Sequence, residues 1–258
     1  MAIKTETANS VQEFIDIVGQ LRDIWSKDGY FDPWFRGQSG FDLPLQPNIF
    51  RYDLIDDEEG IRGEFLRRAA QFMTEPTPQD EWGWYFLMQH YGAPTRLLDW
   101  TDSALVALFF AVNSNHPNRL SVRTDAVVWV LDPWWLNKKA VRYESILLSD
   151  WDLAKRYLPR LFLYDQLRVK WPAAIDPPFI ARRVAVQHSH FTIFGRDENG
   201  LVKLGNRPGG RLARIKLPRK KIDRFRQDLA TCGIADTTVY PDLKGLSDEL
   251  TRYYSSDW

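Results

Sequence analysis

Two short stretches of the sequence bring together side chains that could bind an anion or transfer a proton. Arg36 stands beside Gly37, so a rigid fork of donors would lie next to a backbone that a ligand can approach closely. His90, Arg96 and Asp99 fall within nine residues of one another and supply a titratable ring, a cation and an anion to one loop. Such clusters are typical of active sites, and also of polar networks that hold a loop in place.

Each of these residues therefore has a structural interpretation beside the chemical one. Arg36 could bind a phosphate or carboxylate, or could form a buried ion pair with Asp99. His90 is suited to act as a general base or a ligand contact. Arg96 and Asp99 are more easily explained as structural, since Arg96 could neutralise Asp99, and Asp99 or Thr101 could cap the helix that follows.

A second group of candidates lies late in the sequence. Gln187 and Thr192 could hydrogen-bond a base or an amide edge, although a buried glutamine satisfied by the backbone is equally common. His188 and His190 would share one face of a strand, as paired metal ligands do, but no third ligand of suitable spacing follows, so no metal is expected. Phosphate-binding GxxxxGK, dinucleotide-binding GxGxxG and nucleophile GxSxG motifs are absent.

The spacing of apolar and polar residues predicts the strands and helices that position these side chains. Residues 34–38 alternate aromatic and polar side chains, which predicts a strand with Trp34, Arg36 and Gln38 on one face. Residues 104–112 are apolar around a full helical circumference, which predicts a buried helix. Its start at Thr101–Ser103 offers backbone donors that an anion, or the helix's own caps, would fill.

The remaining pattern predicts one α+β domain spanning residues 1–258, with its core at about 12–254. We expect helices at about 10–27, 56–73, 81–90, 220–232 and 242–254, strands at about 126–131, 180–187, 191–194 and 212–217, and an irregular excursion with short helices over 132–178. A central mixed or antiparallel sheet flanked by helices would accommodate them. Eleven tryptophans indicate a heavily aromatic core.

Charge and composition limit the kinds of partner that the protein is expected to bind. The 34 basic residues equal the 34 acidic ones, so no global field favours nucleic acid or an anionic membrane, although the basic stretch over 211–226 could track phosphates locally. Cys232 is the sole cysteine, in keeping with a reducing compartment. The first ten residues lack a signal-peptide core, and no apolar run is long enough to span a membrane. Cytoplasm is the expected location.

Several motifs together resemble the FRG domain. They are Phe35-Arg36-Gly37-Gln38, the block 87–111 that includes Gln89-His90-Tyr91-Gly92 and Thr95-Arg96-Leu97-Leu98-Asp99-Trp100, and Gln187 with Phe191-Thr192. The similarity extends over roughly residues 12–254. His188-Ser189-His190 departs from it, because the family usually has a glycine-containing turn after the glutamine.

A weaker resemblance concerns the ADP-ribosyltransferase fold. That fold carries an aromatic-Arg-Gly strand whose arginine holds the NAD phosphates, then a Ser/Thr-containing strand-to-helix element, then a late strand with a catalytic glutamate. Residues 35–37, residues 101–103 and Gln187 occur here in that order. Because Gln187 has no carboxylate, the electrostatic support for an oxocarbenium-like transition state is either missing or supplied by another residue such as Asp99.

The resemblances imply a nucleotide-binding, enzyme-like protein with NAD as its substrate and ADP-ribosyl transfer or NAD cleavage as its reaction. The candidate catalytic residues are His90, Gln187 and Asp99, and the candidate ligand contacts are Arg36, Gln38, Arg96, Thr101 and Thr192. Two alternatives stay open: a non-catalytic module that recognises a nucleotide or a protein, and an RNA-binding or RNA 2′-phosphate-processing protein. The first interpretation requires Arg36 and His90 to converge on one solvent-reachable hollow.

Overall fold

The fold is described from a computed structural model, which places residues 3–28, 32–69, 71–73, 77–113, 124–164, 169–177 and 189–254. The strands are β1 (Lys4–Thr7), β2 (Trp34–Gln38), β3 (Leu97–Thr101), β4 (Ala126–Leu131), β5 (Leu147–Leu148), β6 (Ala173–Asp176), β7 (Ser189–Ile193) and β8 (Leu212–Leu217). The helices are α1 (Val11–Trp25), α2 (Asn48–Arg51), α3 (Glu58–Ala69), α4 (Glu81–His90), α5 (Ala104–Asn113), α6 (Pro133–Ala140), α7 (Asp152–Lys155), α8 (Pro159–Tyr164), α10 (Gly200–Gly205), α11 (Ile222–Thr231), α12 (Asp236–Val239) and α13 (Leu243–Tyr254).

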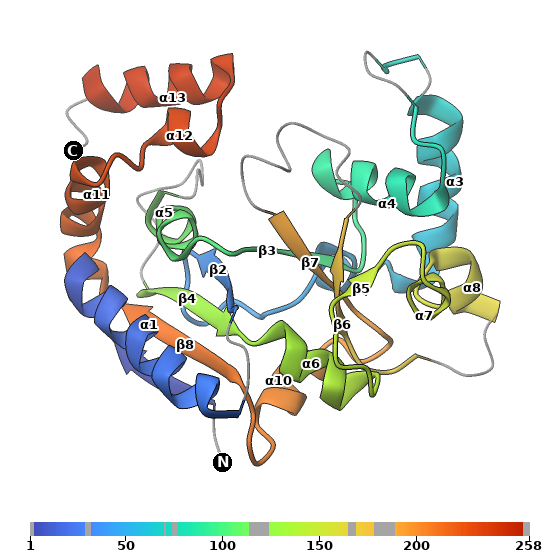
Figure 1. The fold of residues 1–258 in the computed structure, drawn as a ribbon. Helices are drawn as coiled ribbons and strands as arrows, with labels where there is room; N and C mark the ends of the chain where they lie inside the picture. The colour runs from blue at the N-terminus through green and yellow to red at the C-terminus, as the bar shows by residue number, and fades with distance from the viewer. Residues whose placement is uncertain are drawn as a thin grey trace.

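The eight strands form one mixed sheet in the order β1-β8-β4-β2-β3-β7-β6-β5 (Figure 1). β1 runs parallel to β8 and β5 parallel to β6, while the other neighbours are antiparallel. Helices pack on the sheet from both sides. The architecture is therefore the α+β fold with a mixed sheet that the sequence predicts.

The two faces of the sheet carry different cores. Residues that pair across strands point to the same side, so Trp34 shares a face with its partner Leu131, and Phe35 shares the opposite face with Val130. The Trp34 face, named for the residue that points to it, is covered by α2, α6 and α10. The Phe35 face is covered by α1, α5 and α11 over one half, and by α3, α4 and α7 over the other.

Local sequence explains why α1 forms where it does. Ser10 is its N-cap, and the Ser10 hydroxyl accepts a hydrogen bond from the Glu13 amide at 3.2 Å. The helix then buries Phe14, Ile17 and Leu21 at three- and four-residue spacing, which makes one stripe facing the sheet. The capped amphipathic helix predicted near residue 10 is confirmed.

The contact between β2 and α5 depends on Gly37. A Cβ atom at this position would lie 2.0 Å from the Ala107 carbonyl oxygen and 2.5 Å from the Ala111 amide nitrogen. Real side chains do not approach backbone so closely, so only glycine allows the buried helix to pack on the strand. This corrects the expectation that Gly37 leaves space for a ligand, because α5 fills that space.

The interior also contains a buried ionic network. The Arg96 Nε donates to Glu58 Oε2 at 2.7 Å, and both side chains are fully buried. The Arg96 Nη1 donates to the Phe194 carbonyl at 2.7 Å, and Nη2 donates to the Tyr157 carbonyl. The Tyr85 hydroxyl donates to Glu58 and accepts from the Arg96 amide at 2.8 Å. The network joins α3, α4, β3 and the chain after β7.

The main differences from the expected elements concern strands. β3 occupies part of the loop that was expected to deliver His90 and Asp99, while β5 and β6 lie inside the excursion expected to be irregular over 132–178. The strand expected at 180–187 falls outside the described residues. The aromatic core is confirmed, since Trp34, Trp82 and Trp100 are all buried. Among the described helices, none combines the length and the apolar character needed to cross a membrane.

Candidate functional site

Arg36 lies at the centre of the sheet, where β2 and β3 separate. The two strands share a single register pair, Phe35 with Thr101, and beyond it the Arg36 Nη1 donates to the Asp99 carbonyl oxygen at 2.7 Å. The same nitrogen lies 3.7 Å from the Asp99 carboxylate. Arg36 and Asp99 are thus brought together, and the guanidinium helps to connect two strands.

The charge of Arg36 is only partly compensated. The pKa of Arg36 is lowered to about 10, mainly by burial of the guanidinium. Asp99 opposes this shift, and Arg51 of α2 adds to it. The Arg36 Nε is buried and has no hydrogen-bond partner among the described residues, while the side chain as a whole keeps 19% of its exposure. A donor of this kind favours an incoming anion.

Asp99 belongs to a short polar chain that leads to α4. Its carboxylate is 52% exposed and accepts a hydrogen bond from Gln89 Nε2 at 2.8 Å. Gln89 in turn accepts from the Thr95 hydroxyl. Gln89 was not among the predicted site residues, although its place next to His90 in the α4 motif could have indicated it.

His90 is the last residue of α4. Its residue is exposed, and its ring meets the ring of Tyr91 edge-on, with centroids 5.0 Å apart. The residue of α4 that contacts Asp99 is Gln89, one position earlier. The convergence of Arg36 and His90 on one hollow stays a prediction.

The start of α5 is filled by its own caps. The Ser103 hydroxyl accepts from the Val106 amide at 3.3 Å, and the Thr101 hydroxyl accepts from the Ser103 amide at 3.1 Å. The side chain that caps α5 is therefore Ser103 rather than the expected Asp99 or Thr101, and Thr101 bonds the Ser103 amide just before the helix. Both hydroxyls satisfy donors that an anion would otherwise use.

Gln38 and Thr192 bind tryptophans of the Trp34 face. Gln38 Oε1 accepts from Trp129 Nε1 at 2.7 Å, and the Thr192 hydroxyl accepts from Trp100 Nε1 at 3.0 Å. Gln38 is 6% exposed and Thr192 is fully buried. In this arrangement both side chains satisfy indole donors of the core, and a direct ligand contact would require them to change partners.

Arg96 is enclosed rather than facing a ligand. Its guanidinium pairs with Glu58 and not with Asp99, which corrects the expected neutralisation of Asp99. The reason is the direction of the side chain. Arg96 precedes β3 and points into the interior between α3 and α4, whereas the Asp99 carboxylate points out to the surface.

Gln187 and His188 lie outside the described residues, but His190 is described. Its Nδ1 lies 2.6 Å from Asp176 Oδ1 and its Nε2 lies 3.9 Å from Asp102 Oδ2. The imidazole is stacked on the indole of Trp34, with centroids 4.6 Å apart and an interplanar angle of 15°. Sequence reasoning left the role of His190 open and did not indicate its two carboxylate neighbours.

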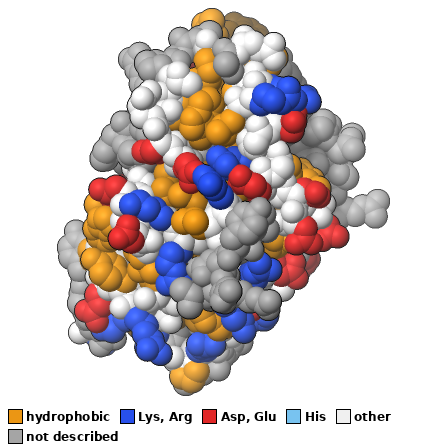
Figure 2. All heavy atoms as spheres, turned by 90° about the vertical axis from the view of Figure 1, so that its right-hand side faces the viewer, with side chains coloured by type: hydrophobic (Ala, Val, Ile, Leu, Met, Phe, Trp, Pro, Cys, Tyr) orange, Lys and Arg blue, Asp and Glu red, His pale blue; other side chains and the backbone are white. Residues whose placement is uncertain are grey.

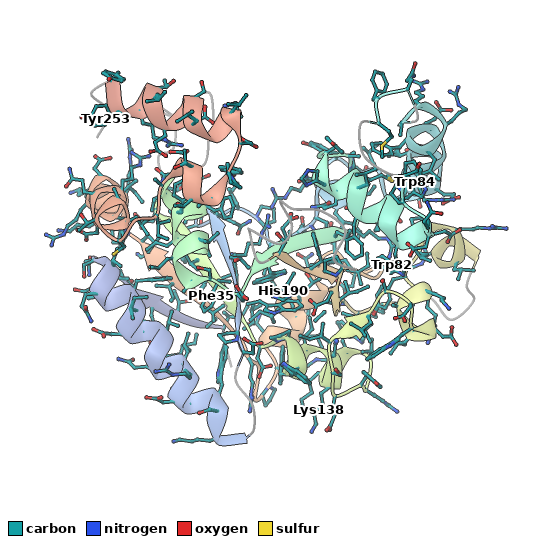
Figure 3. The ribbon with its side chains drawn as sticks, turned by 45° about the horizontal axis from the view of Figure 1, so that its top comes forward. Phe35, Trp82, Trp84, Lys138, His190 and Tyr253 are labelled. Atoms are coloured by element: carbon teal, nitrogen blue, oxygen red, sulfur yellow. The ribbon has the colours of Figure 1, made fainter. Side chains whose placement is uncertain are left out.

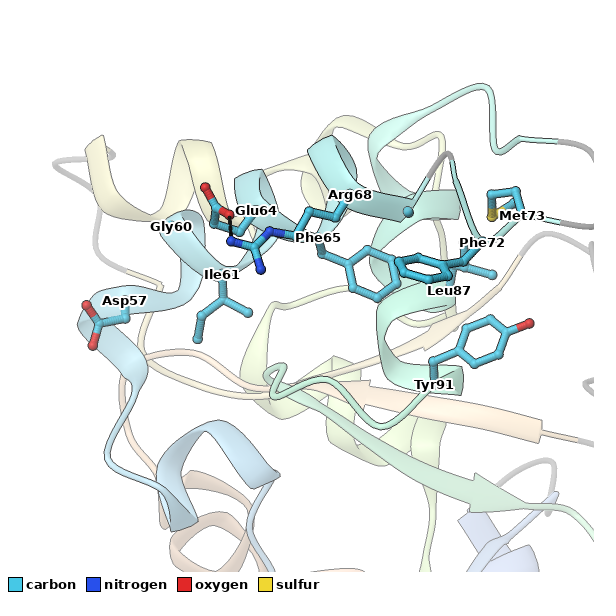
Figure 4. A pocket seen from close by; sticks show the side chains of 11 residues that line it. Asp57, Gly60, Ile61, Glu64, Phe65, Arg68, Phe72, Met73, Leu87 and Tyr91 are labelled. Atoms are coloured by element: carbon cyan, nitrogen blue, oxygen red, sulfur yellow. Dashed lines mark ion pairs between the residues drawn. The ribbon is translucent and has the colours of Figure 1, made fainter.

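The described part of the chain has three hollows that we consider, and none of the predicted site residues lines them. The largest, of about 690 Å³, lies between α3 and α4 (Figure 4) and is mainly apolar, with Ile61, Phe65, Phe72, Met73, Leu87 and Tyr91 in its wall. Figure 2 shows the side of the molecule that carries α3 and α8, where hydrophobic side chains gather in patches between charged ones. A hollow of about 440 Å³ lies against α5, α11 and α13, and one of about 400 Å³ lies beside α10.

Four of the eight basic side chains over 211–226 form ion pairs within the protein. The ion pairs are Arg211 with Asp132 at 2.8 Å, Lys216 with Asp125 at 3.5 Å, Arg224 with Asp228 at 3.7 Å and Arg226 with Asp223 at 2.9 Å. Arg214 stacks over Phe41 at 4.4 Å. The stretch therefore offers less positive charge to a nucleic acid than its sequence indicates. In the described part of the chain, no group of three histidine, cysteine or acidic side chains is placed to hold a metal ion.

Comparison with known proteins yields one match. The family model of the FRG domain matches residues 32–119, a segment that contains β2, α2, α3, α4, β3 and α5 and with them Arg36, His90, Arg96 and Asp99. The resemblance seen in the sequence is confirmed over this segment. No curated protein and no solved structure matches the chain.

Proposed function

We propose, on the premise that this chain carries an FRG domain over residues 32–119, that the protein binds a nucleotide through Arg36 and acts on it as an enzyme. NAD is the favoured substrate. Nicotinamide release, with the ADP-ribose passed to water or to another acceptor, is the favoured reaction.

The observation that carries the proposal is the state of the Arg36 guanidinium. It is partly exposed, its Nε has no hydrogen-bond partner in the described part of the chain, and its pKa is lowered to about 10. The Asp99 carboxylate lies 3.7 Å away and also accepts a hydrogen bond from Gln89. A phosphate oxygen placed against this group would gain charge-assisted hydrogen bonds that Asp99 does not fully supply. Arg96 cannot serve in this way because its three nitrogens already donate inside the protein.

The arrangement around Arg36 also supports NAD over an isolated phosphate. An arginine on β2 is followed by a strand-to-helix element, β3 to α5, that carries Thr101 and Ser103. This is the order in which ADP-ribosyltransferase folds place their phosphate-binding strand and their Ser/Thr element. Asp99, half exposed beside Arg36, is the nearest described carboxylate for the support of positive charge on a ribose.

A second candidate is a recognition module that binds a nucleotide without turning it over. Gln187 favours it, because glutamine stands where the ADP-ribosyltransferase fold has its catalytic glutamate, and an amide gives an oxocarbenium ion no negative charge. The two candidates share the Arg36 site and differ only in turnover.

Calorimetric titration with NAD, together with chromatographic measurement of nicotinamide, tests both. We expect Arg36→Gln to raise the dissociation constant for NAD about 10- to 100-fold, because hydrogen bonds to charged groups contribute about 1.5–3 kcal/mol. Arg67→Gln is the matched control, since Arg67 lies on α3, is 64% exposed and pairs with its helix neighbour Glu64. It should bind NAD as the unmodified protein does.

The outcomes separate the candidates. Binding with nicotinamide release supports the enzyme, and binding without release identifies the recognition module. If the unmodified protein does not bind NAD at millimolar concentration, the proposal is wrong. If Arg36→Gln unfolds while Arg67→Gln does not, Arg36 acts through the fold, and its assignment as the phosphate ligand is withdrawn.

A further inference from the structure

Four neighbouring strands have ends that lie side by side, and side chains at these ends form a cluster. β2 begins at Trp34, β7 begins at Ser189, β3 ends at Thr101 and β6 ends at Asp176. Because these neighbours are antiparallel, the start of one strand lies beside the end of the next. His190, Asp176 and Asp102 are brought together in this way, although they are far apart in the sequence.

His190 is held in one orientation by contacts on two sides. Trp34 stacks against the ring, and Asp176 Oδ1 lies 2.6 Å from Nδ1. A carboxylate can only accept a hydrogen bond, so the proton of the neutral ring sits on Nδ1 and the lone pair on Nε2. This is the tautomer that can accept a proton from a ligand.

The Nε2 side of the ring is suited to a small oxygen-containing group. Asp102 Oδ2 lies 3.9 Å from Nε2, too far for a direct hydrogen bond but close enough for one oxygen atom to bridge the two. The side chain of His190 keeps 23% of its exposure. The indole Nε1 of Trp34, on the ring that stacks on His190, is buried and lacks a hydrogen-bond partner among the described residues.

The charges around His190 come from three elements. Asp176 lies on β6, Asp102 follows β3, and Asp32 precedes β2. Burial raises the pKa of Asp32 above its ordinary value, His190 lowers it, and Asp102 and Asp176 raise it, which places all four groups within electrostatic range of one another. Figure 3 shows His190 near the middle of the molecule, between the helices that flank the two halves of the sheet.

We propose that His190 is the proton-accepting catalytic residue of this protein, that Asp176 is the residue that positions it, and that the group it deprotonates is the hydroxyl that attacks the ribose. The inference rests on the proposed function, because β2 joins the two sites. Trp34, which stacks on His190, is two residues from Arg36 on the same strand, which separates their Cα atoms by roughly 7 Å. A dinucleotide held by phosphate at Arg36 can extend to His190.

The step balances without a further reactant. His190 Nε2 takes the proton of the attacking water or acceptor hydroxyl, and the electron pair of that oxygen forms the new bond to the anomeric carbon. The bond from this carbon to the nicotinamide nitrogen breaks, and its electron pair leaves with nicotinamide, which becomes neutral. The imidazolium that forms lies between Asp176 and Asp102, which stabilise it, and it later releases its proton to solvent.

The test is the rate of nicotinamide release from NAD between pH 5 and 9 for the unmodified protein, His190→Gln and Asp176→Asn. We expect His190→Gln to lower kcat by about 100- to 10,000-fold and to remove the acidic limb of the pH profile, with the dissociation constant for NAD within about threefold. Asp176→Asn should lower kcat as well, because an amide would favour the wrong tautomer. Asp152→Asn is the control, since Asp152 is 98% exposed and pairs with Lys155 on α7.

The outcomes distinguish this inference from the proposed function. If the unmodified protein releases no nicotinamide, the proposed reaction fails, and the role of His190 in it fails with it. If the unmodified protein is active and His190→Gln is equally active, only the inference is overturned. The inference is also overturned if His190→Gln changes binding but not kcat. Should His190→Gln unfold on heating at a temperature where the protein is stable, the kcat and pH profile of Asp176→Asn decide the question.

Discussion

Replacing Glu58 by glutamine removes the carboxylate that pairs with Arg96 in the interior. Both side chains are fully buried, and Arg96 Nε and Glu58 Oε2 are 2.7 Å apart. Breaking a buried ion pair by removing one partner typically costs about 3–5 kcal/mol, because the remaining charge stays in a medium of low polarity. We therefore expect Glu58→Gln to lower the free energy of unfolding by about 3–5 kcal/mol.

Arg96→Met should cost more than Glu58→Gln. The substitution leaves the Glu58 carboxylate uncompensated and also removes the donors to the Phe194 and Tyr157 carbonyls. Each stranded buried acceptor adds about 1–3 kcal/mol. The double variant Glu58→Leu/Arg96→Met removes both charges, so it should be more stable than Arg96→Met alone.

Urea unfolding followed by tryptophan fluorescence and by circular dichroism measures these differences. Arg36→Gln provides the comparison, because Arg36 is partly exposed and its ionic contact with the Asp99 carboxylate is 3.7 Å long. It should cost no more than about 1–2 kcal/mol. A loss below 1 kcal/mol for Glu58→Gln, or a larger loss for Arg36→Gln than for Arg96→Met, would refute the assignment of Arg96 to structure and Arg36 to ligand.

Two further predictions follow from buried contacts. Gly37→Ala should destabilise the protein by about 3 kcal/mol or more in the same urea assay, because its Cβ would overlap the Ala107 carbonyl of α5, whereas Gly63→Ala on the open side of α3 should not destabilise it. Burial raises the pKa of Tyr85 and of Tyr157, so above about pH 10 the unfolded chain loses phenol protons that the folded protein keeps, and stability falls as pH rises. Urea unfolding at pH 9, 10 and 11 should show a decline of up to about 1.4 kcal/mol per pH unit for each tyrosine, and a shallower decline in Tyr157→Phe; an equal decline in both proteins would contradict the assignment to Tyr157.

The elements with clear local patterns could be predicted from the sequence. β2 alternates because Trp34 and Phe35 enter different cores, one on each face of the sheet. α5 is apolar around its circumference because it packs on β2, β3, β4 and α11. In each case the pattern of apolar residues within the element reflects the cores that it packs against.

β3 could not be recognised in this way. Leu97 and Leu98 are adjacent and both buried, but Leu97 enters the core beneath α4 and Leu98 enters the core on the Trp34 face. A strand that is buried on both sides has no alternation, so its nature depends on β7, almost one hundred positions later. The strand was therefore mistaken for a loop.

The contacts of the candidate site could likewise be predicted only in part from the sequence. The pairing of Arg36 with Asp99 was among the alternatives that residue types and spacing indicated. The partners of Arg96 and His190 were not, because Glu58 is 38 residues from Arg96 and Asp176 is 14 residues from His190. The order of strands in the sheet decides which carboxylate pairs with which cation. That order depends on long-range strand pairing and cannot be predicted from a short segment of sequence.

The strand order also affects how the chain folds during its synthesis on the ribosome. β1 pairs with β8, and because about 200 residues separate them, β1 waits for β8 for roughly 10 to 40 seconds at ordinary rates of translation. Pairings between distant segments form slowly, and an unpaired strand can meanwhile associate with other chains. β1 has only four residues and carries Lys4 and Glu6, and such a short, charged strand is a poor template for aggregation while it waits.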